Sequence, residues 1–126
     1  MIGKVALVSI VDDDVSVRES LPPLLRQVGY AAEAFSSAEA FLASDRIDET
    51  SCLLLDVAMP GMSGPDLQEE LAHRHPAIPI VFITGQRDQT LRLRLVALGA
   101  VDCLFKPFSE SALFAALDAA LRTSSG

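Results

Sequence analysis

The chain alternates between short apolar runs and longer segments in which apolar residues recur at helical spacing. Three of the short runs, residues 4–11, 52–55 and 80–83, are almost wholly apolar. Continuous apolar runs of this length are typical of strands that are buried on both faces, as in parallel sheets. Two weaker runs, 31–35 and 101–105, complete a set of five predicted strands. Glu33 lies in the middle of the first of these, which is typical of an edge strand.

Helical spacing fills the segments between these runs. The pattern predicts helices over 15–28, after Ser36, from Pro65 to about 73–76, over 89–98 and after Ser109, with Ser36 and Glu39 at capping-box spacing. Pro22 and Pro23 fall well inside the first helix. Because each proline removes a backbone donor and crowds the preceding turn, we expect a kink or a break near Ser20.

Strand and helix alternate five times, which predicts an α/β fold with one parallel sheet and right-handed crossovers. The three most apolar strands should be central and the other two should be edges. The predicted strand order is therefore 2-1-3-4-5, the flavodoxin-like order of a doubly wound (βα)5 sheet. We expect a single domain over residues 1–122, with residues 123–126 forming a tail or the start of a linker.

Composition argues against several classes of protein, including nucleic-acid-binding and membrane proteins. The 126 residues carry a formal net charge of −7, which argues against direct nucleic-acid binding by this domain. No apolar run approaches the length of a membrane span, and the N-terminus does not resemble a signal peptide. Cys52 and Cys103 show no metal-binding spacing. These features predict a cytoplasmic domain that does not bind a membrane.

Polar side chains follow the predicted strands at the point where each strand ends. Asp12, Asp13 and Asp14 follow the first strand, and Asp56, Thr84 and Lys106 end the third, fourth and fifth. Parallel strands end at the same edge of a sheet, so we expect these groups to lie together. Clustered carboxylates need a cation, and oxygen ligands favour Mg²⁺, with Mn²⁺ as a substitute. A metal, a lysine and a hydroxyl around one carboxylate predict phosphoryl transfer with Asp56 as the nucleophile.

Four motifs in this order and spacing give a specific resemblance. They are IVDDD (10–14), LLLDVAMPGMSG (53–64), VFITG (81–85) and GAVDCLFKPF (99–108). With them, the chain resembles a CheY-like receiver domain of a two-component response regulator over essentially its whole length. SAEAFL (37–42) and GAVD (99–102) are most similar to the FixJ-type branch.

The resemblance implies a role for each matching residue. Asp56 would accept a phosphoryl group from a histidine kinase or a phosphotransfer protein. Asp13, Asp56 and the backbone carbonyl of Ala58 would bind Mg²⁺ directly, and Asp12 would act through water. Thr84 and Lys106 would contact the phosphoryl group, and the peptide before Pro107 would be cis. Such a domain catalyses its own phosphorylation and dephosphorylation and is not otherwise an enzyme.

The read-out departs from the family pattern. Receivers usually carry an aromatic residue three positions before the lysine, and here that position is Cys103. Signal would then leave through backbone shifts or through Phe105. In the helix over 89–98, we expect Leu91, Leu95 and Leu98 to face inward. Leu93 and Val96 on the opposite side, together with the fifth strand, would form a surface for a partner or for a homodimer.

Two other classes of function compete with this hypothesis. Asp12 and Asp14 resemble the nucleophile and the acid–base residue of haloacid-dehalogenase-like phosphatases. That hypothesis leaves Asp56 and its loop unexplained, and no acidic pair follows a late strand. The third class is a pseudo-receiver that binds partners without phosphorylation, which the complete set of acid, threonine and lysine disfavours.

Overall fold

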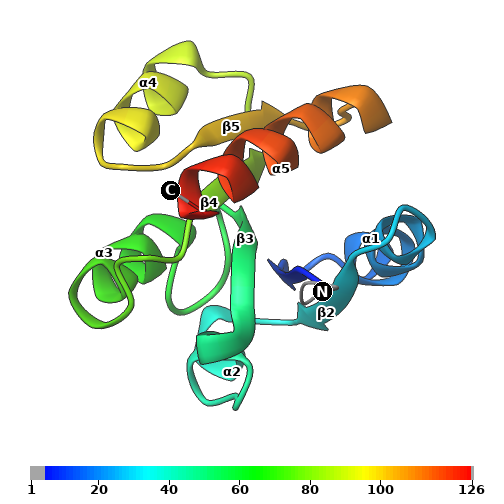
Figure 1. Ribbon diagram of the computed structural model, residues 1–126. Helices are drawn as coiled ribbons and strands as arrows, with labels where there is room; N and C mark the ends of the chain where they lie inside the picture. Colours follow the sequence, from blue (N-terminus) through cyan, green and yellow to red (C-terminus); the bar gives the residue numbers. More distant parts are fainter. Residues whose placement is uncertain (1–4, 126) are drawn as a thin grey trace.

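The computed structural model describes residues 5–125 as a five-stranded sheet with helices on both faces (Figure 1). In chain order the elements are β1 (Leu7–Val11), α1 (Val15–Gln27), β2 (Ala31–Phe35), α2 (Ala38–Leu42), the 3₁₀ turn η1 (Ile47–Glu49), β3 (Thr50–Asp56), α3 (Gly64–Arg74), β4 (Ile80–Thr84), α4 (Gln89–Ala97), β5 (Asp102–Phe105) and α5 (Glu110–Ser125). All strand pairs are parallel, in the order β2-β1-β3-β4-β5. The predicted strand order and flavodoxin-like fold are confirmed.

Each face of the sheet has its own apolar core. On one face, α1 and α5 cover side chains that include Ile10, Leu54 and Ile83. On the other face, α2, α3 and α4 cover Leu53, Leu55, Phe82 and their neighbours. Consecutive residues of β3 therefore point to opposite cores, which explains why its sequence is a continuous apolar run without alternation.

The first helix contains both prolines and does not break. α1 runs from Val15 to Gln27, so a break near Ser20 is wrong, and the alternative of a kink there stays a prediction. Pro22 is buried against the sheet together with Leu21 and Leu25, and this packing offsets the lost backbone hydrogen bond. The hydroxyl of Ser20 donates to the carbonyl of Ser16 at 2.7 Å within the same helix.

Two predictions about individual helices need correction. Ser37 rather than Ser36 caps α2, because the Ser37 hydroxyl accepts from the Ala40 amide at 3.0 Å. In α4, Leu95 is buried but Leu98 is 64% exposed, because the helix ends at Ala97 and the chain turns away there. Leu93 and Val96 are exposed at 67% and 41%, as expected for the outer side.

Three predictions concern the start of β1, the C-terminal boundary of the domain and the absence of a membrane span. β1 begins at Leu7, and Lys4, where the predicted strand began, lies outside the described residues. α5 continues to Ser125, and the domain boundary at residue 122 stays a prediction. Within residues 5–125, no helix combines the length and the apolar character that crossing a membrane requires.

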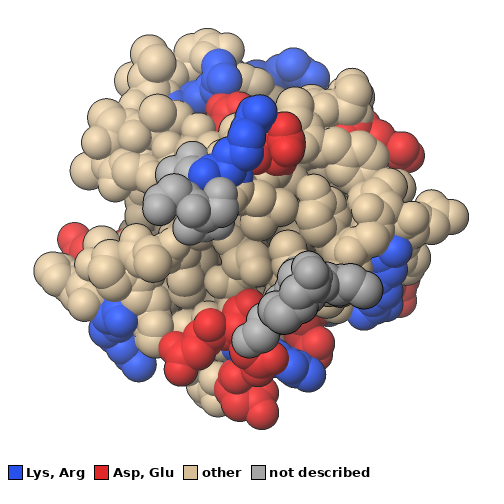
Figure 2. Space-filling model, in the orientation of Figure 1, with Lys and Arg blue, Asp and Glu red and all other residues tan. Residues whose placement is uncertain are grey.

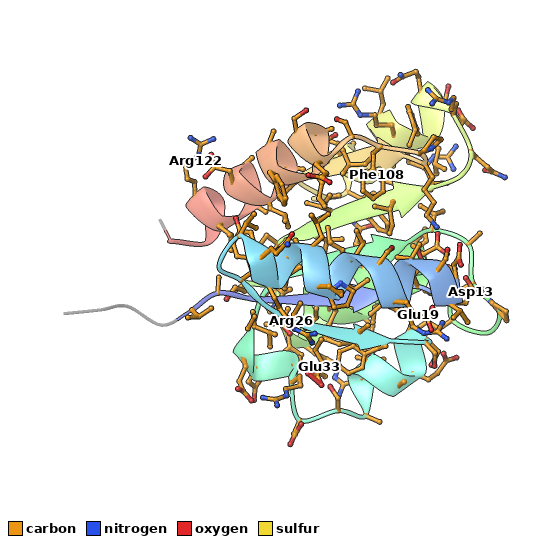
Figure 3. All side chains as sticks on the ribbon, turned by 90° about the vertical axis from the view of Figure 1, so that its right-hand side faces the viewer. Asp13, Glu19, Arg26, Glu33, Phe108 and Arg122 are labelled. Atoms are coloured by element: carbon orange, nitrogen blue, oxygen red, sulfur yellow. The ribbon has the colours of Figure 1, made fainter. Side chains whose placement is uncertain are left out.

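The candidate site residues lie at one end of the sheet. On the face seen in Figure 2, acidic side chains gather near α2 and basic ones are scattered. Figure 3 shows that Asp13 lies at the end of the sheet toward which the strand arrows point, whereas Arg122 lies toward the other end. The candidate chemistry therefore lies at the carboxyl edge of the sheet.

Candidate functional site

Four of the predicted site residues come together at the carboxyl edge. Asp12 follows β1 and is completely buried, Asp13 beside it is exposed, and Asp56 ends β3 with 7% of its surface exposed. Lys106 follows β5, and its amide donates to the carbonyl of Thr84 at 2.7 Å. The parallel register of β3, β4 and β5 brings these strand ends side by side.

Lys106 links the two buried carboxylates but binds them unequally. Its Nζ lies 2.9 Å from Asp12 Oδ2 and 3.9 Å from Asp56 Oδ1. Asp12 also accepts from the amide of Asp14 through Oδ1 at 2.9 Å. Asp12 is therefore held by a cation and an amide, whereas Asp56 lies farther from the same cation and beside the carboxyl groups of Asp12 and Asp13.

The electrostatics of the site follow from burial and crowding. Burial away from water and the charge of Asp12 raise the pKa of Asp56 to about 7, although Lys106 opposes the shift. Burial lowers the pKa of Lys106, but its hydrogen bond to Asp12 and the neighbouring carboxylates outweigh this and raise it overall. The hydroxyl and amide of Ser16 lower the pKa of Asp14, which caps α1.

The acidic cluster fits a hard divalent cation. One carboxylate oxygen from each of Asp12, Asp13 and Asp56 can be chosen so that all three lie within 4.8 Å of one another. An all-oxygen donor set of this kind favours Mg²⁺ or Mn²⁺, and the exposed Asp13 leaves one side open for water ligands. Ala58 lies two residues beyond Asp56 in an exposed part of the loop, and its role as a ligand stays a prediction.

The remaining predicted residues lie at or near the same edge. Thr84 is 3% exposed, and its hydroxyl accepts from the Gln86 amide at 3.1 Å rather than contacting Asp56. The Lys106–Pro107 peptide is cis. Cys103 is buried in the core under α2, α3 and α4, and Phe105 is half-buried against the same core. Their predicted part in the read-out remains untested.

The loop after β3 is closed by backbone contacts. The Gly64 amide donates to the carbonyl of Val57 at 2.9 Å. A Cβ added at Gly64 would overlap the backbone oxygen of Asp56 and would lie 3.0 Å from the ring of Phe82. Glycine is therefore required at this position, because the chain returns so close to the end of β3.

Two residues at the site were missed by the sequence patterns. Arg18 of α1 donates through Nη1 to the backbone carbonyl of Asp12 at 3.0 Å, and Glu39 of α2 accepts from the amide of Met62 at 3.0 Å through Oε2. Both bind backbone groups, Arg18 one that is six residues away and Glu39 one that is 23 residues away, and motif spacing gives no signal for such contacts. The capping-box spacing of Glu39 predicts a contact within its own helix, whereas its carboxylate binds the loop after β3.

The geometry agrees with the resemblance drawn from the sequence, because an acidic cluster and a lysine lie at the carboxyl edge of a doubly wound sheet. Residues 8–118 match the family model described as the response regulator receiver domain. The chain therefore belongs to the receiver-domain family of two-component systems.

Individual relatives agree with this family. Nodulation protein W of Bradyrhizobium diazoefficiens is 50% identical over 115 residues, which are 91% of this chain and 51% of that protein. Response regulator protein TodT of Pseudomonas putida is 42% identical over 122 residues, or 97% of this chain and 54% of that protein. The chain spans about half the length of these curated relatives.

Solved structures show the same fold. The structure of FixJ-N has a TM-score of 0.83 and 35% identity, covering 95% of this chain and 96% of that one. The structure of response regulator StyR has a TM-score of 0.88 and 44% identity, covering 97% of this chain and 62% of that one. The predicted similarity to FixJ-type receivers is confirmed.

Proposed function

We propose that Asp56 accepts a phosphoryl group from the phosphohistidine of a histidine kinase or a phosphotransfer protein. The observation that supports this most is the unequal sharing of Lys106 by two buried carboxylates. The Lys106 ammonium group engages Asp12 at 2.9 Å and lies 3.9 Å from Asp56, so it would not block attack by the Asp56 carboxylate. An Asp56 oxygen would form a bond to phosphorus as the bond between phosphorus and the histidine nitrogen breaks, and the electron pair would return to the imidazole.

The surrounding residues would prepare Asp56 for this transfer. Asp13, Asp56 and the Ala58 carbonyl would hold Mg²⁺, or Mn²⁺ in its place, with Asp12 acting through water. When bound, the ion would neutralise negative charge on the phosphoryl oxygens. Lys106 would pair with one of these oxygens. The hydroxyl of Thr84, which now accepts from the Gln86 amide, would rotate to donate to another.

The product would act as a switch in the cytoplasm. The added charge would draw Thr84 and Lys106 toward Asp56 and change the face formed by α4, β5 and α5. Leu93 and Val96, exposed on α4, would then belong to a surface for a partner, an effector domain or a second copy of the chain. The domain would catalyse only its own phosphorylation and dephosphorylation. It would not bind nucleic acid or a membrane directly.

Reaction with a small phosphodonor tests this function. The protein is incubated with acetyl phosphate in MgCl₂ or in EDTA, and its intact mass is followed by mass spectrometry. We expect one phosphoryl group per chain in MgCl₂ and none in EDTA.

The competing functions give different results. Sustained turnover of p-nitrophenyl phosphate that is lost in Asp12→Asn would support a phosphatase and contradict the proposal. The geometry disfavours it, because Asp12 is fully buried and already bound to Lys106. Absence of any Mg²⁺-dependent modification would instead indicate a pseudo-receiver.

A further inference from the structure

Glu39 of α2 contacts the loop that follows Asp56. Its Oε2 accepts the backbone N–H of Met62 at 3.0 Å, across 23 positions of sequence. Ser37 already caps α2, so the Glu39 side chain is not needed to cap its own helix. A carboxylate that accepts a backbone N–H makes a charge-assisted hydrogen bond, which is stronger than one between neutral groups.

The loop is shaped to receive this carboxylate. Gly61 has a φ of +75°, a conformation that side chains rarely adopt. A Cβ at Gly61 would lie 2.7 Å from Glu39 Oε2. The glycine therefore both permits the turn and leaves the space that the carboxylate occupies.

Glu39 lies on a helix that is packed into the core. Its helix neighbours Ala38 and Phe41 are fully buried, and the ring of Phe41 packs edge-to-face against Phe35 with centroids 5.4 Å apart. The other end of the loop is closed by the bond from the Gly64 amide to the Val57 carbonyl. The segment 58–61 thus lies between two fixed points, one of which is supplied by α2.

We infer that Glu39 is a positioning residue that holds this loop in the form that presents the Ala58 carbonyl to a divalent cation. The inference rests on the proposed metal site. It assigns to α2 a part in setting cation affinity, through the backbone of the loop and without a direct contact with the cation. The hydrogen bond, rather than the negative charge of Glu39, carries the effect.

Two substitutions at Glu39 separate the hydrogen bond from the charge. Glu39→Ala removes the acceptor, whereas Glu39→Gln removes the charge but keeps an oxygen that can accept from Met62. The matched control is Glu110→Ala, which removes the same charge from an exposed position in the first turn of α5. MgCl₂ is titrated into each metal-free protein, and amide NMR shifts give the dissociation constant without any phosphorylation.

We expect Glu39→Ala to weaken Mg²⁺ binding by about tenfold, the usual effect of removing a group that orients a metal ligand. Glu39→Gln should weaken binding by only about threefold, because a neutral acceptor retains roughly half of the strength of the hydrogen bond. Hydrogen exchange at the Met62 amide should accelerate in Glu39→Ala but not in Glu39→Gln. Equal weakening in both variants would show that charge is responsible and would overturn the inference.

A second variant disturbs the same contact from the loop side. Gly61→Ala would displace the Glu39 carboxylate and strain the backbone at a φ of +75°, so it should also weaken Mg²⁺ binding and expose the Met62 amide. Unchanged affinity in both Glu39→Ala and Gly61→Ala would contradict the inference. If wild type binds Mg²⁺ but acetyl phosphate does not modify it, the proposed function fails while the titration still decides the role of Glu39.

Discussion

At the scale of single residues, the site depends on how two neighbouring carboxylates differ. Asp12 has a close cation and an amide donor, and Asp56 has neither at short range. The environment of Asp56 favours its neutral form in the metal-free protein, because burial and the charge of Asp12 raise its pKa to about 7. A bound divalent cation would reverse this preference, which couples cation binding to loss of a proton.

This difference predicts a pH-dependent effect of Asp56→Asn. A folded-state pKa above the ordinary value of 3.8 means that the folded protein binds the proton more tightly than the unfolded chain. The contribution of Asp56 to stability is therefore present below about pH 4 and lost as the pH rises to about 7. In EDTA at pH 8, we expect Asp56→Asn to raise the Tm by at least about 3 °C.

The increase in Tm caused by Asp56→Asn should be smaller at pH 4.5, where the Asp56 carboxyl group of wild type is already largely protonated. Thermal unfolding followed by circular dichroism measures the Tm at both pH values. Asp45→Asn, the same charge change at an exposed position, is the control. An equal increase at the two pH values would contradict the assigned environment of Asp56.

Sequence patterns predicted the residues at strand ends but not the residues that support them. Asp56, Thr84 and Lys106 could be placed together because buried parallel strands must end at one edge. Arg18 and Glu39 could not, because each binds a backbone group whose position depends on the folded loop. The unequal pairing of Lys106 also depends on distances that only the folded strands determine.

At the scale of elements, the loop between β3 and α3 requires a glycine at its end. A Cβ at Gly64 would overlap the Asp56 backbone, which cannot move without shifting β3. We expect Gly64→Ala to lower the free energy of unfolding by about 2 kcal/mol or more, as overpacking does. Gly85→Ala is the matched control, because no atom lies within 4 Å of the added Cβ there. Urea unfolding compares the two, and equal stability would contradict the close return of the loop.

The continuity of α1 gives a prediction for its second proline. Pro23 is exposed and lacks the N–H that would donate to the carbonyl of Glu19. Pro23→Ala should raise the free energy of unfolding by about 1–2 kcal/mol, because the restored helical bond outweighs the greater entropy of the unfolded chain. Urea unfolding measures this change. A loss of stability would mean that Pro23 packs more tightly than its exposure indicates.

The two prolines of α1 show that tertiary packing can maintain a helix where the local sequence disfavours one. The sequence pattern predicted a break because two donors are lost within one turn. The buried face of α1 instead continues through Leu21, Pro22 and Leu25 against the sheet. Similarly, the inward face predicted for α4 fails at Leu98, because the helix ends one residue earlier.

At the scale of the whole molecule, the fold was predictable from the apolar character of the strands. The three central strands are the most apolar because both of their faces are covered, and this places β2 and β5 at the edges. The same arrangement delivers the acids and the lysine to one edge, at the end of the sheet where Figure 3 shows Asp13 and away from Arg122. A partner surface on α4 could be proposed from sequence, because Leu93 and Val96 fall on the side opposite Leu95, and these two side chains are exposed in the structure.

The most direct test of the central claim is to identify the residue that becomes phosphorylated. Protein treated with acetyl phosphate and MgCl₂ is reduced with borohydride, which converts an aspartyl phosphate to homoserine, and the position is read by peptide mass spectrometry. We predict homoserine at residue 56 in wild type and at no aspartate in Asp56→Asn. Homoserine at residue 12, or unreduced Asp56 in a protein that has gained phosphate, would contradict the account.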